Sequence, residues 1–491
     1  MLSLVHVLFG VQPKAMRQMP RIPAAWQTVG FSEVVVDSRE VVPGALFVAL
    51  DGERTNGHNF LVDAVARGAS GALVQRDEVE RLQAELAHTQ RPWTLLDPAN
   101  CDGLEAHSLQ TCLFISVDDP LMALQRLAVY HRRQHTPTVV GITGSVGKTS
   151  TKEVVAAILS RRFRTLKSKR SYNSEATMPT TLLQITPDHE VVVLEMGMWA
   201  PGEIRFLANL AWPYIGIVTN VGPSHLERVK SIDVVEQAKS ELPDSLPPDG
   251  IAILNIDDER VARMARRTLA RVFSYGLNPS ADVWADQVES HGLQGITFDA
   301  HHANETVRIK TPLLGKHSVY TALAGIAIGL VMGMNWDDII AGLQDENSVA
   351  RIVQRPGLHG STIIDDTYNA APVSAIAALD LLAELDGRRI AALGDMLELG
   401  AIEEEAHRSV GRRAAAVVQE LICVGQRARW IADEAQVAGM TPEHIKVVDT
   451  NNDVVDALQT MLRPGDYVLV KGSRGAAMES IVAAVQRHPE E

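Results

Sequence analysis

A glycine-rich stretch at residues 141–150, with the sequence GITGSVGKTS, carries the residue types that bind phosphate. Glycines let backbone N–H groups converge on phosphate oxygens, while Lys148 could serve the β- and γ-phosphates and Thr149 could hold Mg²⁺. The apolar run 138–143 predicts a strand, and the pattern after the stretch predicts a helix whose positive end would face the anion. This context favours a phosphate-binding loop over a tight strand-to-helix turn with a solvated lysine.

The spacing of these glycines differs from that of the common phosphate loop, G-x-x-x-x-G-K-[ST]. Counted back from Gly147, the first glycine position of that pattern holds Ile142, and glycines stand instead at Gly141 and Gly144. The offset indicates either a chance cluster of glycines or a phosphate loop of another lineage.

Polar residues at the ends of two other predicted strands could extend this site. Glu195 follows the run VVVL, where a carboxylate can hold Mg²⁺ opposite the loop, although such a glutamate is more often a helix cap or a surface residue. Asn255 ends the run AILN, and its side-chain amide could pair with the edge of an adenine. Asp257 and Asp258, which follow, could simply cap the next helix.

The elements that must position these residues begin with a small α/β segment. Residues 31–75 predict strand, turn, strand and helix, with a Pro43-Gly44 turn between two β-branched runs. A helix at about residues 120–134 leads to Pro137, where we place a domain boundary. The helix within residues 31–75 is predicted to bury one face, made of Phe60, Leu61, Ala64 and Val65.

From residue 138 the pattern alternates strand and helix, which is typical of a parallel sheet with crossover helices. The runs TVVGIT, EVVVLEMG, YIGIVTNV and GIAILNID predict buried strands, and helices at 317–344 close the segment. The alternation then restarts and predicts a second, smaller, Rossmann-like unit. We therefore predict an α/β protein of three domains, at residues 1–136, 137–346 and 347–491, the central one a P-loop domain with a mainly parallel sheet.

Composition limits the classes of function. The 491 residues carry a net charge of −14, which argues against a general nucleic-acid surface. Cys101, Cys112 and Cys423 have no metal-ligand spacing and suggest a reducing compartment and packing roles. No run approaches the roughly 20 apolar residues of a membrane span, and the apolar start MLSLVHVLFG lacks the basic region of a signal peptide. We expect a cytoplasmic, monomeric protein that acts on small molecules.

The displaced glycines match a known lineage. The loop from Thr143 to Ser150 resembles T-G-[ST]-x-G-K-[ST]-[ST] of the Mur ligase superfamily, ATP-dependent amide-forming enzymes of peptidoglycan synthesis together with folylpolyglutamate synthases. The segments VDSREVVPGALFVALDGERTNGHNF, LEMGMWAPGEI, TNVGPSHLE, EQAKSEL and LNIDDERV are similar to the family's, in the same order. IIDDTYNAAP, LGDMLELG and VLVKGSRGAAMESI resemble the branch that joins D-alanyl-D-alanine to a UDP-N-acetylmuramoyl tripeptide. The resemblance covers nearly the whole chain.

The resemblance implies an ATP and magnesium site around the loop. It implies Mg²⁺ ligation by Thr149 and Glu195, a second Mg²⁺ at His225, and a carbamylated, anionic Lys239 as a further metal ligand. Lys148, Lys239 and His225 would be the catalytic residues; without the resemblance, His225 is an ordinary loop histidine and Lys239 a solvated helix lysine. The residues that it assigns to ATP are Thr143, Gly144, Ser145, Val146, Gly147, Lys148, Thr149, Ser150, Asn255, Arg351 and Asp366.

Arg351 and Asp366 have an alternative to the nucleotide contact that the resemblance implies. Each could simply form a surface ion pair, which contributes little to stability. Both residues lie in the predicted carboxy-terminal domain, where they would reach the nucleotide when that domain closes.

The resemblance also implies substrate contacts in the first and last domains. The first domain would bind the uridine nucleotide through Ser38 and Arg39, because the forked, permanently charged donors of arginine suit a pyrophosphate. Lys471, Ser473 and Arg474 lie at a predicted strand-to-helix turn and would receive the carboxylate of the acceptor dipeptide, with a plain turn as the alternative. The remaining residues assigned to substrate are Asn173, Glu175, Tyr368 and Asn369.

The sequence departs from the family pattern at positions expected to contact substrate or to support domain closure. The expected N-N-E-I-G-V-P stretch reads NSEATMP, the Y-N-A-N-P stretch reads YNAAP, and the H-N-x-x-N-A helix start reads HSVYTA. None of these changes removes a phosphate or metal ligand, so the ATP chemistry is retained while the acceptor is less firmly specified. The departing residues include Ser174, Ala176, Ser318, Thr321 and Ala371.

The expected function is ATP-dependent addition of D-alanyl-D-alanine to UDP-N-acetylmuramoyl-tripeptide through an acyl phosphate. Two alternatives stay open: a related ligase with a different amino-acid acceptor, and a nucleotide-gated binding protein with little catalysis. The DSR, YNAAP and LGDMLELG segments argue against a folate substrate. The joint presence of Lys148, Thr149, Glu195, His225 and Lys239 disfavours the binding protein, which has no need of two metal sites.

Overall fold

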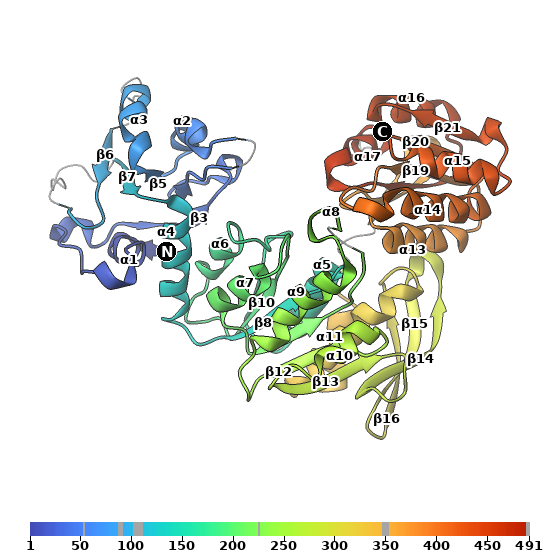
Figure 1. Ribbon diagram of the computed structural model, residues 1–491, viewed down its shortest axis with the longest axis horizontal. Coiled ribbons are helices and arrows are strands. Elements are labelled where there is room, and N and C mark those ends of the chain that lie inside the picture. Colours follow the sequence, from blue (N-terminus) through green and yellow to red (C-terminus); the bar gives the residue numbers. More distant parts are fainter. Residues whose placement is uncertain (53–54, 87–91, 102–110, 224–225, 346–352, 488–491) are drawn as a thin grey trace. The chain divides into compact units, whose positions relative to one another are not determined.

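The computed structural model describes residues 1–52, 55–86, 92–101, 111–223, 226–345 and 353–487. The chain forms two compact units (Figure 1). The first unit comprises Met1–Val139, Leu166–Met196 and Phe206–Trp212, and the second comprises Val140–Thr165, Gly197–Arg205 and Pro213–Glu491. Among the described residues, no helix is both long and apolar enough to cross a membrane.

A parallel sheet of five strands forms the centre of the first unit, in the order β3-β4-β5-β7-β6. Helices α2 (Leu61–Ala66) and α3 (Val79–Leu86) contribute Leu61, Ala64, Val65 and Leu82 to its core. The prediction that Phe60 shares this face is wrong, because Phe60 ends the 3-10 turn before α2 and is exposed. The strands are β3 (Val34–Val35), β4 (Leu46–Val48), β5 (Gly71–Gln75), β6 (Trp93–Leu96) and β7 (Cys112–Val117).

Helix α1 (Leu4–Gly10) packs on α4 (Pro120–Arg132) and brings three histidines together. His131 Nε2 lies 2.8 Å from the carbonyl of Ile185, and because a carbonyl only accepts, this nitrogen carries the proton. The other ring nitrogen of a neutral His131 therefore accepts from His6 Nε2, at 3.1 Å. Burial, then the neighbouring His131 and His135, lower the pKa of His6 to about 4.

In the second unit, the large sheet runs in the order β16-β15-β14-β13-β12-β11-β8. The pairs β8–β11, β11–β12 and β12–β13 are parallel, as the strand–helix alternation predicts. The elements are β8 (Thr138–Thr143), α5 (Lys148–Leu159), β11 (Ile215–Val218), α8 (Leu226–Val229), α9 (Ile232–Asp244), β12 (Ile251–Asn255), α10 (Glu259–Met264), β13 (Arg271–Gly276), α11 (Val319–Val331) and α12 (Trp336–Leu343).

Three long strands extend this sheet beyond β13. Strand β14 (Val283–Ser290) pairs parallel to β13, and β15 (Ile296–His302) and β16 (Glu305–Thr311) follow as antiparallel neighbours (Figure 1). Alternate residues of β15, namely Ile296, Phe298 and Ala300, are fully buried. This half-buried alternation is typical of an antiparallel strand with one solvated face.

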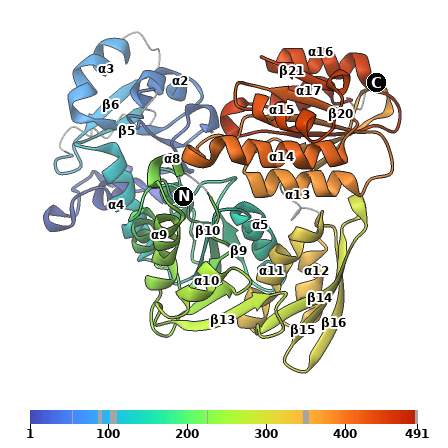
Figure 2. The ribbon, with the colours of Figure 1, turned by 45° about the vertical axis from the view of Figure 1, so that its right-hand side comes forward.

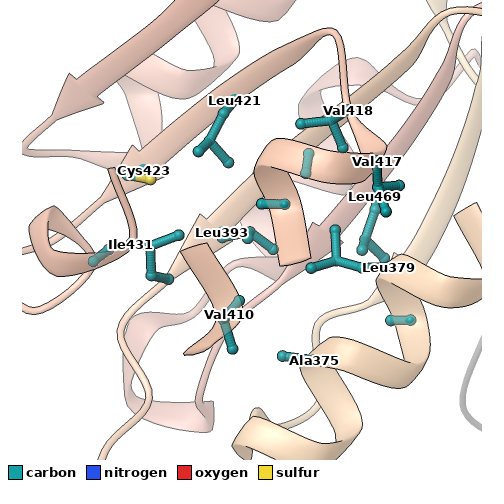
Figure 3. Close-up of a cluster of buried hydrophobic side chains, with 14 of the residues drawn as sticks. Ala375, Leu379, Leu393, Val410, Val417, Val418, Leu421, Cys423, Ile431 and Leu469 are labelled. Carbon is teal, nitrogen blue, oxygen red and sulfur yellow. The ribbon is translucent and has the colours of Figure 1, made fainter. Parts of the chain in front are cut away.

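The carboxy-terminal part of the second unit is a three-layer α/β arrangement around the sheet β17-β18-β22-β19-β20-β21. Alternate residues of its strands face opposite layers: Ala391 and Leu393 join a core with α13, α14 and α15, while Ile390 and Ala392 join a core with α16 and α17. Figure 3 shows the first of these cores, in which Cys423 packs, and Figure 2 shows α13 and α14 side by side. Cys101, Cys112 and Cys423 are free thiols and buried, so the predicted packing roles are confirmed.

The bounds of these carboxy-terminal elements match the predicted alternation. They are β17 (Val353–Pro356), β18 (Thr362–Asp366), α13 (Pro372–Ala383), β19 (Arg389–Gly394), α14 (Glu403–Val417), β20 (Glu420–Val424), α15 (Arg429–Val437), β21 (Ile445–Val448), α16 (Asn451–Met461), β22 (Tyr467–Lys471) and α17 (Glu479–Val485). The fold class is therefore confirmed as α/β with a mainly parallel central sheet.

Acidification is expected to loosen the packing of α1 on α4. Because the folded chain holds the pKa of His6 at about 4, against an ordinary 6.5, the unfolded chain binds more protons between these values and stability falls as the pH falls. Hydrogen exchange of α1 and α4 amides, corrected for intrinsic rates, should show opening easier by on the order of 1 kcal/mol at about pH 5 than at about pH 7.5. His6→Gln should reduce this difference; an equal slope in both proteins would contradict the assignment.

Candidate active site

The glycine-rich loop joins β8 to α5, as the sequence predicts. Gly147 is the N-cap of α5 with a φ of 88°, a left-handed conformation that glycine adopts without steric cost. Thr143 at the end of β8 is fully buried, and Thr149 in the first turn of α5 is 7% exposed. The backbone N–H groups of this turn and the positive end of the twelve-residue helix form the kind of cradle that binds phosphate.

A second loop clasps the first. Since Val218 of β11 pairs with Thr143 of β8, the residues after both strands meet at one edge of the sheet. The side chain of Asn220 accepts from Val146 N and donates to Val146 O, both at 2.9 Å, and the hydroxyl of Thr219 donates to the same carbonyl at 2.8 Å. These contacts fix the turn between Ser145 and Gly147.

Gly144 is where this clasp leaves no room for a side chain. A Cβ built on Gly144 would lie 1.9 Å from Thr219 Oγ1, far inside van der Waals contact. On the other side, Ser145 Oγ and the backbone of Gly222 exchange hydrogen bonds at 2.9 Å. The glycine therefore allows the two loops to touch. The sequence signal for the clasp is the pair Thr219-Asn220 directly after a buried strand.

Lys148 folds back onto the loop that precedes it. Its ammonium donates to the carbonyls of Gly144 at 2.8 Å and Ser145 at 3.4 Å, and the side chain is half-buried. This arrangement places a cation directly beside the cradle. Lys148 is therefore partly shielded from solvent, and its role at the phosphates stays a prediction.

Lys239 lies on α9 and is 2% exposed, so the alternative of a solvated helix lysine is wrong. Burial first, then the nearby charge of Lys148, hold the pKa of Lys239 well below its ordinary range. Both influences favour the neutral amine over the charged ammonium. A buried neutral amine is a nucleophile, which a protonated surface lysine is not.

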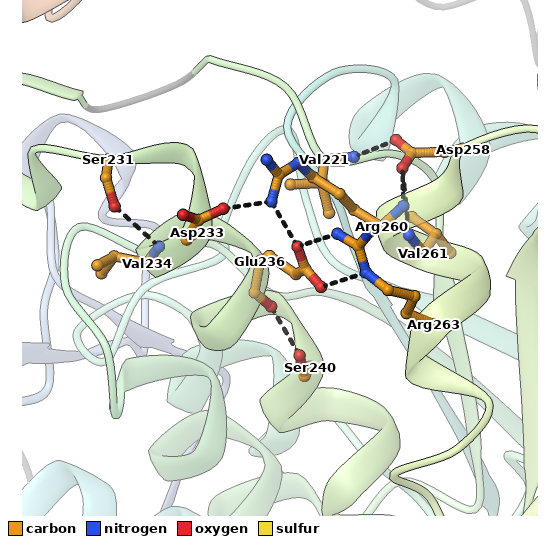
Figure 4. A network of polar contacts seen from close by, with 10 residues as sticks. All are labelled: Val221, Ser231, Asp233, Val234, Glu236, Ser240, Asp258, Arg260, Val261 and Arg263. Carbon is orange, nitrogen blue, oxygen red and sulfur yellow. Dashed lines mark hydrogen bonds and ion pairs between the residues drawn. The ribbon is translucent and has the colours of Figure 1, made fainter.

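An ion-pair network fixes the helix that carries Lys239 (Figure 4). Glu236 of α9 accepts from Arg260 at 2.6 Å and from Arg263 at 2.8 Å, both on α10. Asp258 caps α10 by accepting from Arg260 N and Val261 N, as predicted, and its other oxygen accepts from Val221 N at 2.7 Å. The loop after β11, α10 and α9 thus form one connected frame around the phosphate loop.

An aromatic cavity of about 360 Å³ opens from one side of the loop. Tyr275, Tyr320 and His317 line it together with Val146 and Gly147. Its size and flat, mainly apolar walls suit a planar heterocycle. Burial, with the nearby Asp257 carboxylate, raises the pKa of Tyr320 to about 12, so its phenol keeps its proton.

Asn255 also lines this cavity, and its side chain is engaged with the backbone. Its amide donates to the carbonyl of Thr219 at 2.9 Å, and its oxygen accepts from Asp257 N at 3.1 Å. Because Asn255 ties the end of β12 to the clasping loop, the structure gives it a positioning contact. Its pairing with an adenine stays a prediction.

A smaller cavity of about 150 Å³ lies between Gly147 and Ser150 of the loop and Asp366 and Lys471 of the carboxy-terminal sheet. Lys471 donates to Asp366 at 2.5 Å and to the carbonyl of Asn369 at 2.9 Å. Both charged side chains are buried, so the alternative of a surface ion pair for Asp366 is wrong. Ser318 and Thr321, two of the departures from the family pattern, line this same cavity.

A third cavity, of about 280 Å³, lies on the other side of the loop and includes Ser145 and Lys148. Ser473 and Arg474 line it at the turn after β22, as the sequence predicts for that turn, together with Tyr368 and Asn369. The guanidinium of Arg474 lies 5.3 Å from the centre of the Tyr368 ring. Ala371, a third departure, lines this cavity and the aromatic one.

The predicted uridine-nucleotide contacts lie in the first unit. Ser38 is buried in a 3-10 turn, and Arg39 is exposed and paired with Asp37 at 2.7 Å. The next residue, Glu40, accepts from Tyr172 at 2.7 Å and forms ion pairs with two basic side chains, Lys169 and Arg170. The three cations in this small area suit an anionic ligand, and the role of Ser38 and Arg39 stays a prediction.

Glu195 ends β10 (Val191–Glu195) in the first unit and is 1% exposed, so it is not a surface residue. Asn173 donates to its carboxylate at 2.8 Å, which brings two predicted site residues together. Glu175 is exposed, and its backbone carbonyl accepts from the Gln125 amide at 3.2 Å. His225 and Arg351 lie outside the described residues. Within the described ranges, no three His, Cys, Asp or Glu side chains gather to hold a metal ion.

The fold and the loop define the class of protein: an α/β P-loop nucleotide-binding protein with a Rossmann-like carboxy-terminal part. Comparison with known families narrows that class. The Mur ligase middle domain matches residues 142–329, the Mur ligase glutamate ligase domain residues 351–474, and the catalytic domain of the Mur ligase family residues 31–98. The chain belongs to the Mur ligase family and is of the MurF type, which confirms the resemblance carried by the phosphate loop.

Individual relatives match over nearly their whole length. The UDP-N-acetylmuramoyl-tripeptide–D-alanyl-D-alanine ligase of Synechocystis sp. is 32% identical over 459 residues, covering 93% of this chain and 92% of the relative. The ligase of the same name from Escherichia coli is 33% identical over 461 residues, covering 93% and 94%. A crystal structure of MurF from Acinetobacter baumannii matches with a TM-score of 0.77 at 28% identity, covering 98% of each chain.

Gly144→Ala is expected to weaken ATP binding at least about tenfold with the fold retained, because the new Cβ would force the loop away from Thr219. Gly222→Ala is the matched control, since a Cβ there meets its nearest neighbour, Ser145 Cβ, at an ordinary 3.7 Å. Calorimetric titration of ATP into both variants measures the effect. Equal affinities in the two variants would show that the close contact does not shape the cradle.

Proposed function

We propose that this chain is an ATP-dependent ligase that joins D-alanyl-D-alanine to UDP-N-acetylmuramoyl-tripeptide and releases ADP and phosphate. The relatives from Synechocystis and Escherichia coli carry this reaction in their names and align over more than nine-tenths of the chain. The reaction belongs to peptidoglycan synthesis, and we infer that it takes place in the cytoplasm, because it uses ATP and a free uridine nucleotide.

The observation that carries the proposal is the position of one loop between two cavities. Val146 and Gly147 line the aromatic cavity, whereas Ser145 and Lys148 line the cavity that contains Arg474. A nucleotide with its base in the first cavity would present its terminal phosphate at Lys148, where the second cavity begins. A ligase needs this arrangement because the activated carboxylate and the acceptor must meet beside the phosphate loop.

The residues of the chain would act through charge and alignment. The ammonium of Lys148 would turn from the carbonyls of its own loop to the β- and γ-phosphates and stabilise the charge that accumulates there. The tripeptide carboxylate would take the γ-phosphoryl group to give an acyl phosphate, and the acceptor amine would then displace phosphate. Arg474 would hold the acceptor carboxylate with its forked donors, so that the amine faces the acyl carbon.

The oxygen donors that the resemblance assigns are of the kind that magnesium binds. Thr149 would hold one Mg²⁺ with Glu195, whose carboxylate is kept in place by Asn173, and His225 would serve a second. Magnesium prefers one or two protein oxygens together with phosphate oxygens and water, so a large cluster of acidic residues is not required. Bound there, the ion would neutralise charge on the phosphates.

Lys239 would act as a carbamate. A neutral lysine amine adds to carbon dioxide, forms a C–N bond and loses one proton, which leaves an anionic carboxylate-like group. Burial and the neighbouring Lys148 charge favour the neutral amine that this reaction needs. The carbamate would pair with Lys148 or a metal ion and so avoid the repulsion that a charged Lys239 would have with the neighbouring Lys148 ammonium.

The division into three domains is part of this proposal. Each of the three family matches falls within one proposed domain, at residues 31–98 in 1–136, residues 142–329 in 137–346, and residues 351–474 in 347–491. The first domain would bind the uridine nucleotide at Ser38 and Arg39, and the last would bring the acceptor site to the loop through Asp366, Lys471 and Arg474.

The direct test is ADP release with the UDP-muramoyl tripeptide fixed and the acceptor varied. We expect release with D-alanyl-D-alanine and only background release with L-alanyl-L-alanine or D-alanine. Release with another amine alone would support a ligase of different acceptor specificity, and binding of ATP without any release would support a binding protein.

Lys148→Ala should lower turnover by at least about 100-fold, because it removes the cation that serves the phosphates.

Lys239→Ala should likewise lose most activity, and short carboxylic acids such as acetate or propionate should restore part of it if the lysine acts as a carbamate. The acid would place a carboxylate in the space left by the side chain. Lys148→Ala is the matched control, because the missing group there is a cation and the same acids should have no effect. Failure of every short acid to restore activity to Lys239→Ala would argue against the carbamate.

A further inference from the structure

One wall of the cavity next to Arg474 is a short loop between β19 and α14. Leu397, Glu398 and Leu399 of this loop line the cavity together with Ser473 and Tyr368. The loop belongs to the LGDMLELG segment, to which the reaction as proposed so far assigns no role. We call residues 396–399 the wall loop.

The wall loop has a backbone conformation that neighbours must enforce. Glu398 has a φ of 66°, in the left-handed region that non-glycine residues rarely adopt. Such a conformation is strained and persists only where surrounding contacts fix it. The wall loop is therefore held by its contacts, and the loss of one contact should let it relax.

Two anchors hold the start of the wall loop. Leu397 N donates to Ser473 Oγ at 2.9 Å, and Ser473 N in turn donates to the carbonyl of Asp395 at 3.0 Å. The preceding amide, Met396 N, donates to His407 Nε2 at 3.0 Å. One anchor thus comes from the turn after β22, and the other is an imidazole on α14.

The imidazole of His407 is held in one neutral form. Its Nδ1 lies 2.7 Å from the carbonyl of Glu403, and because a carbonyl only accepts, Nδ1 carries the proton. Its Nε2 accepts from Met396 N–H and must therefore be free of a proton. The ring is fully buried, and the edge-to-face contact with Trp430, at 5.7 Å between ring centres, leaves it little freedom to turn.

The helix under His407 is rigidly placed. Val410 and Val417 of α14 point into the core that Leu379, Leu393 and Leu421 share (Figure 3). A hydrogen bond from this helix therefore ties the wall loop to the packed interior of the carboxy-terminal sheet.

The charged groups that face His407 come from three elements. Asp395 lies in the segment after β19, Glu403 begins α14, and Arg427 lies in the segment before α15. Arg427 donates to Glu403 at 2.7 Å, and its backbone N–H donates to Asp395 at 2.9 Å, so both carboxylates already have cationic or N–H partners. Burial is the largest influence on the ring and lowers the pKa of His407 below its ordinary 6.5.

We propose that His407 is a positioning residue for the acceptor: its neutral imidazole holds the Met396 amide and through it the wall loop, and adding a proton to Nε2 releases that wall. A protonated Nε2 would face the N–H of Met396 with a second donor, so the bond would be lost. This inference rests on the proposed function, which places the acceptor in the cavity that the wall loop lines.

The test compares Michaelis constants for acceptor and ATP in two variants of the full chain. His407→Leu removes the ring nitrogen that accepts the hydrogen bond from Met396 N. It should raise KM for D-alanyl-D-alanine about tenfold, with KM for ATP changed less than about twofold. His407→Gln offers an amide oxygen to Met396 and should restore the acceptor KM. The matched control is Val410→Ala, one turn along α14, which loses core packing in the same cluster but keeps the hydrogen bond from Met396 to His407, and it should leave the ratio of the two constants unchanged.

The pH profile gives a second readout. In the wild type, KM for D-alanyl-D-alanine should rise as the pH falls below the ordinary pKa of an imidazole, because His407 then gains a proton. In His407→Gln the part of the rise that is due to His407 should be absent. Protonation of the acceptor amine affects both proteins equally and cancels in the comparison. If His407→Leu fails to fold, the profiles of the wild type and His407→Gln still decide the question.

Hydrogen exchange at residues 396–400 separates this inference from the proposed function, because it needs no acceptor. Faster exchange there in His407→Leu, with protection kept in His407→Gln, would support the positioning role even if D-alanyl-D-alanine proved to be the wrong acceptor. Unchanged exchange together with an unchanged acceptor KM in His407→Leu would overturn it. Equal changes in the acceptor and ATP constants would also overturn it, since they would indicate a general loss of structure.

Discussion

The hydrogen bonds between the phosphate loop and the turn after β11 hold the geometry on which the rest of the site depends. Thr219 and Asn220 bind both the backbone N–H and the carbonyl of Val146, and the absence of a side chain at Gly144 lets the two turns touch. The register of β8 and β11, with Val218 beside Thr143, brings the turns to the same edge. The cradle is therefore shaped before any anion arrives, which reduces the conformational entropy lost on binding.

Three buried lysines in the second unit show different ways to accommodate an amine away from water. Lys471 forms an ion pair with Asp366, and Lys152 forms one with Glu153 at 2.9 Å. Removal of one partner from such a buried pair typically costs about 3–5 kcal/mol, because a charge is left uncompensated. Lys239 differs, since burial and the charge of Lys148 favour its neutral form. The preferred protonation state of each amine follows from its surroundings, so the same residue type forms an ion pair at one position and favours the neutral amine at another.

The sequence predicted the elements better than the contacts between them. The runs at β8, β11 and β12 predict parallel strands because they are short, apolar and separated by helical patterns. The phosphate loop was equally predictable, since it needs only local residue types in order. The strands β14, β15 and β16 were not predicted. They form an antiparallel extension of the sheet and do not follow the alternation of strands and helices.

Contacts over long sequence distances could not be predicted from local pattern. The burial of Lys239 and its low pKa depend on the packing of α9, and the Asp366–Lys471 pair joins residues 105 positions apart. His407 looks like any helix histidine until its two ring nitrogens are seen between Glu403 and Met396.

Strand β16 lies at the far end of the large sheet. It is the last strand in the order and would be free to pair with another chain. Its charged residues Arg308 and Lys310 alternate with inward-facing ones, so an incoming strand would have to desolvate a row of ions. These charges therefore oppose edge-to-edge aggregation by electrostatics.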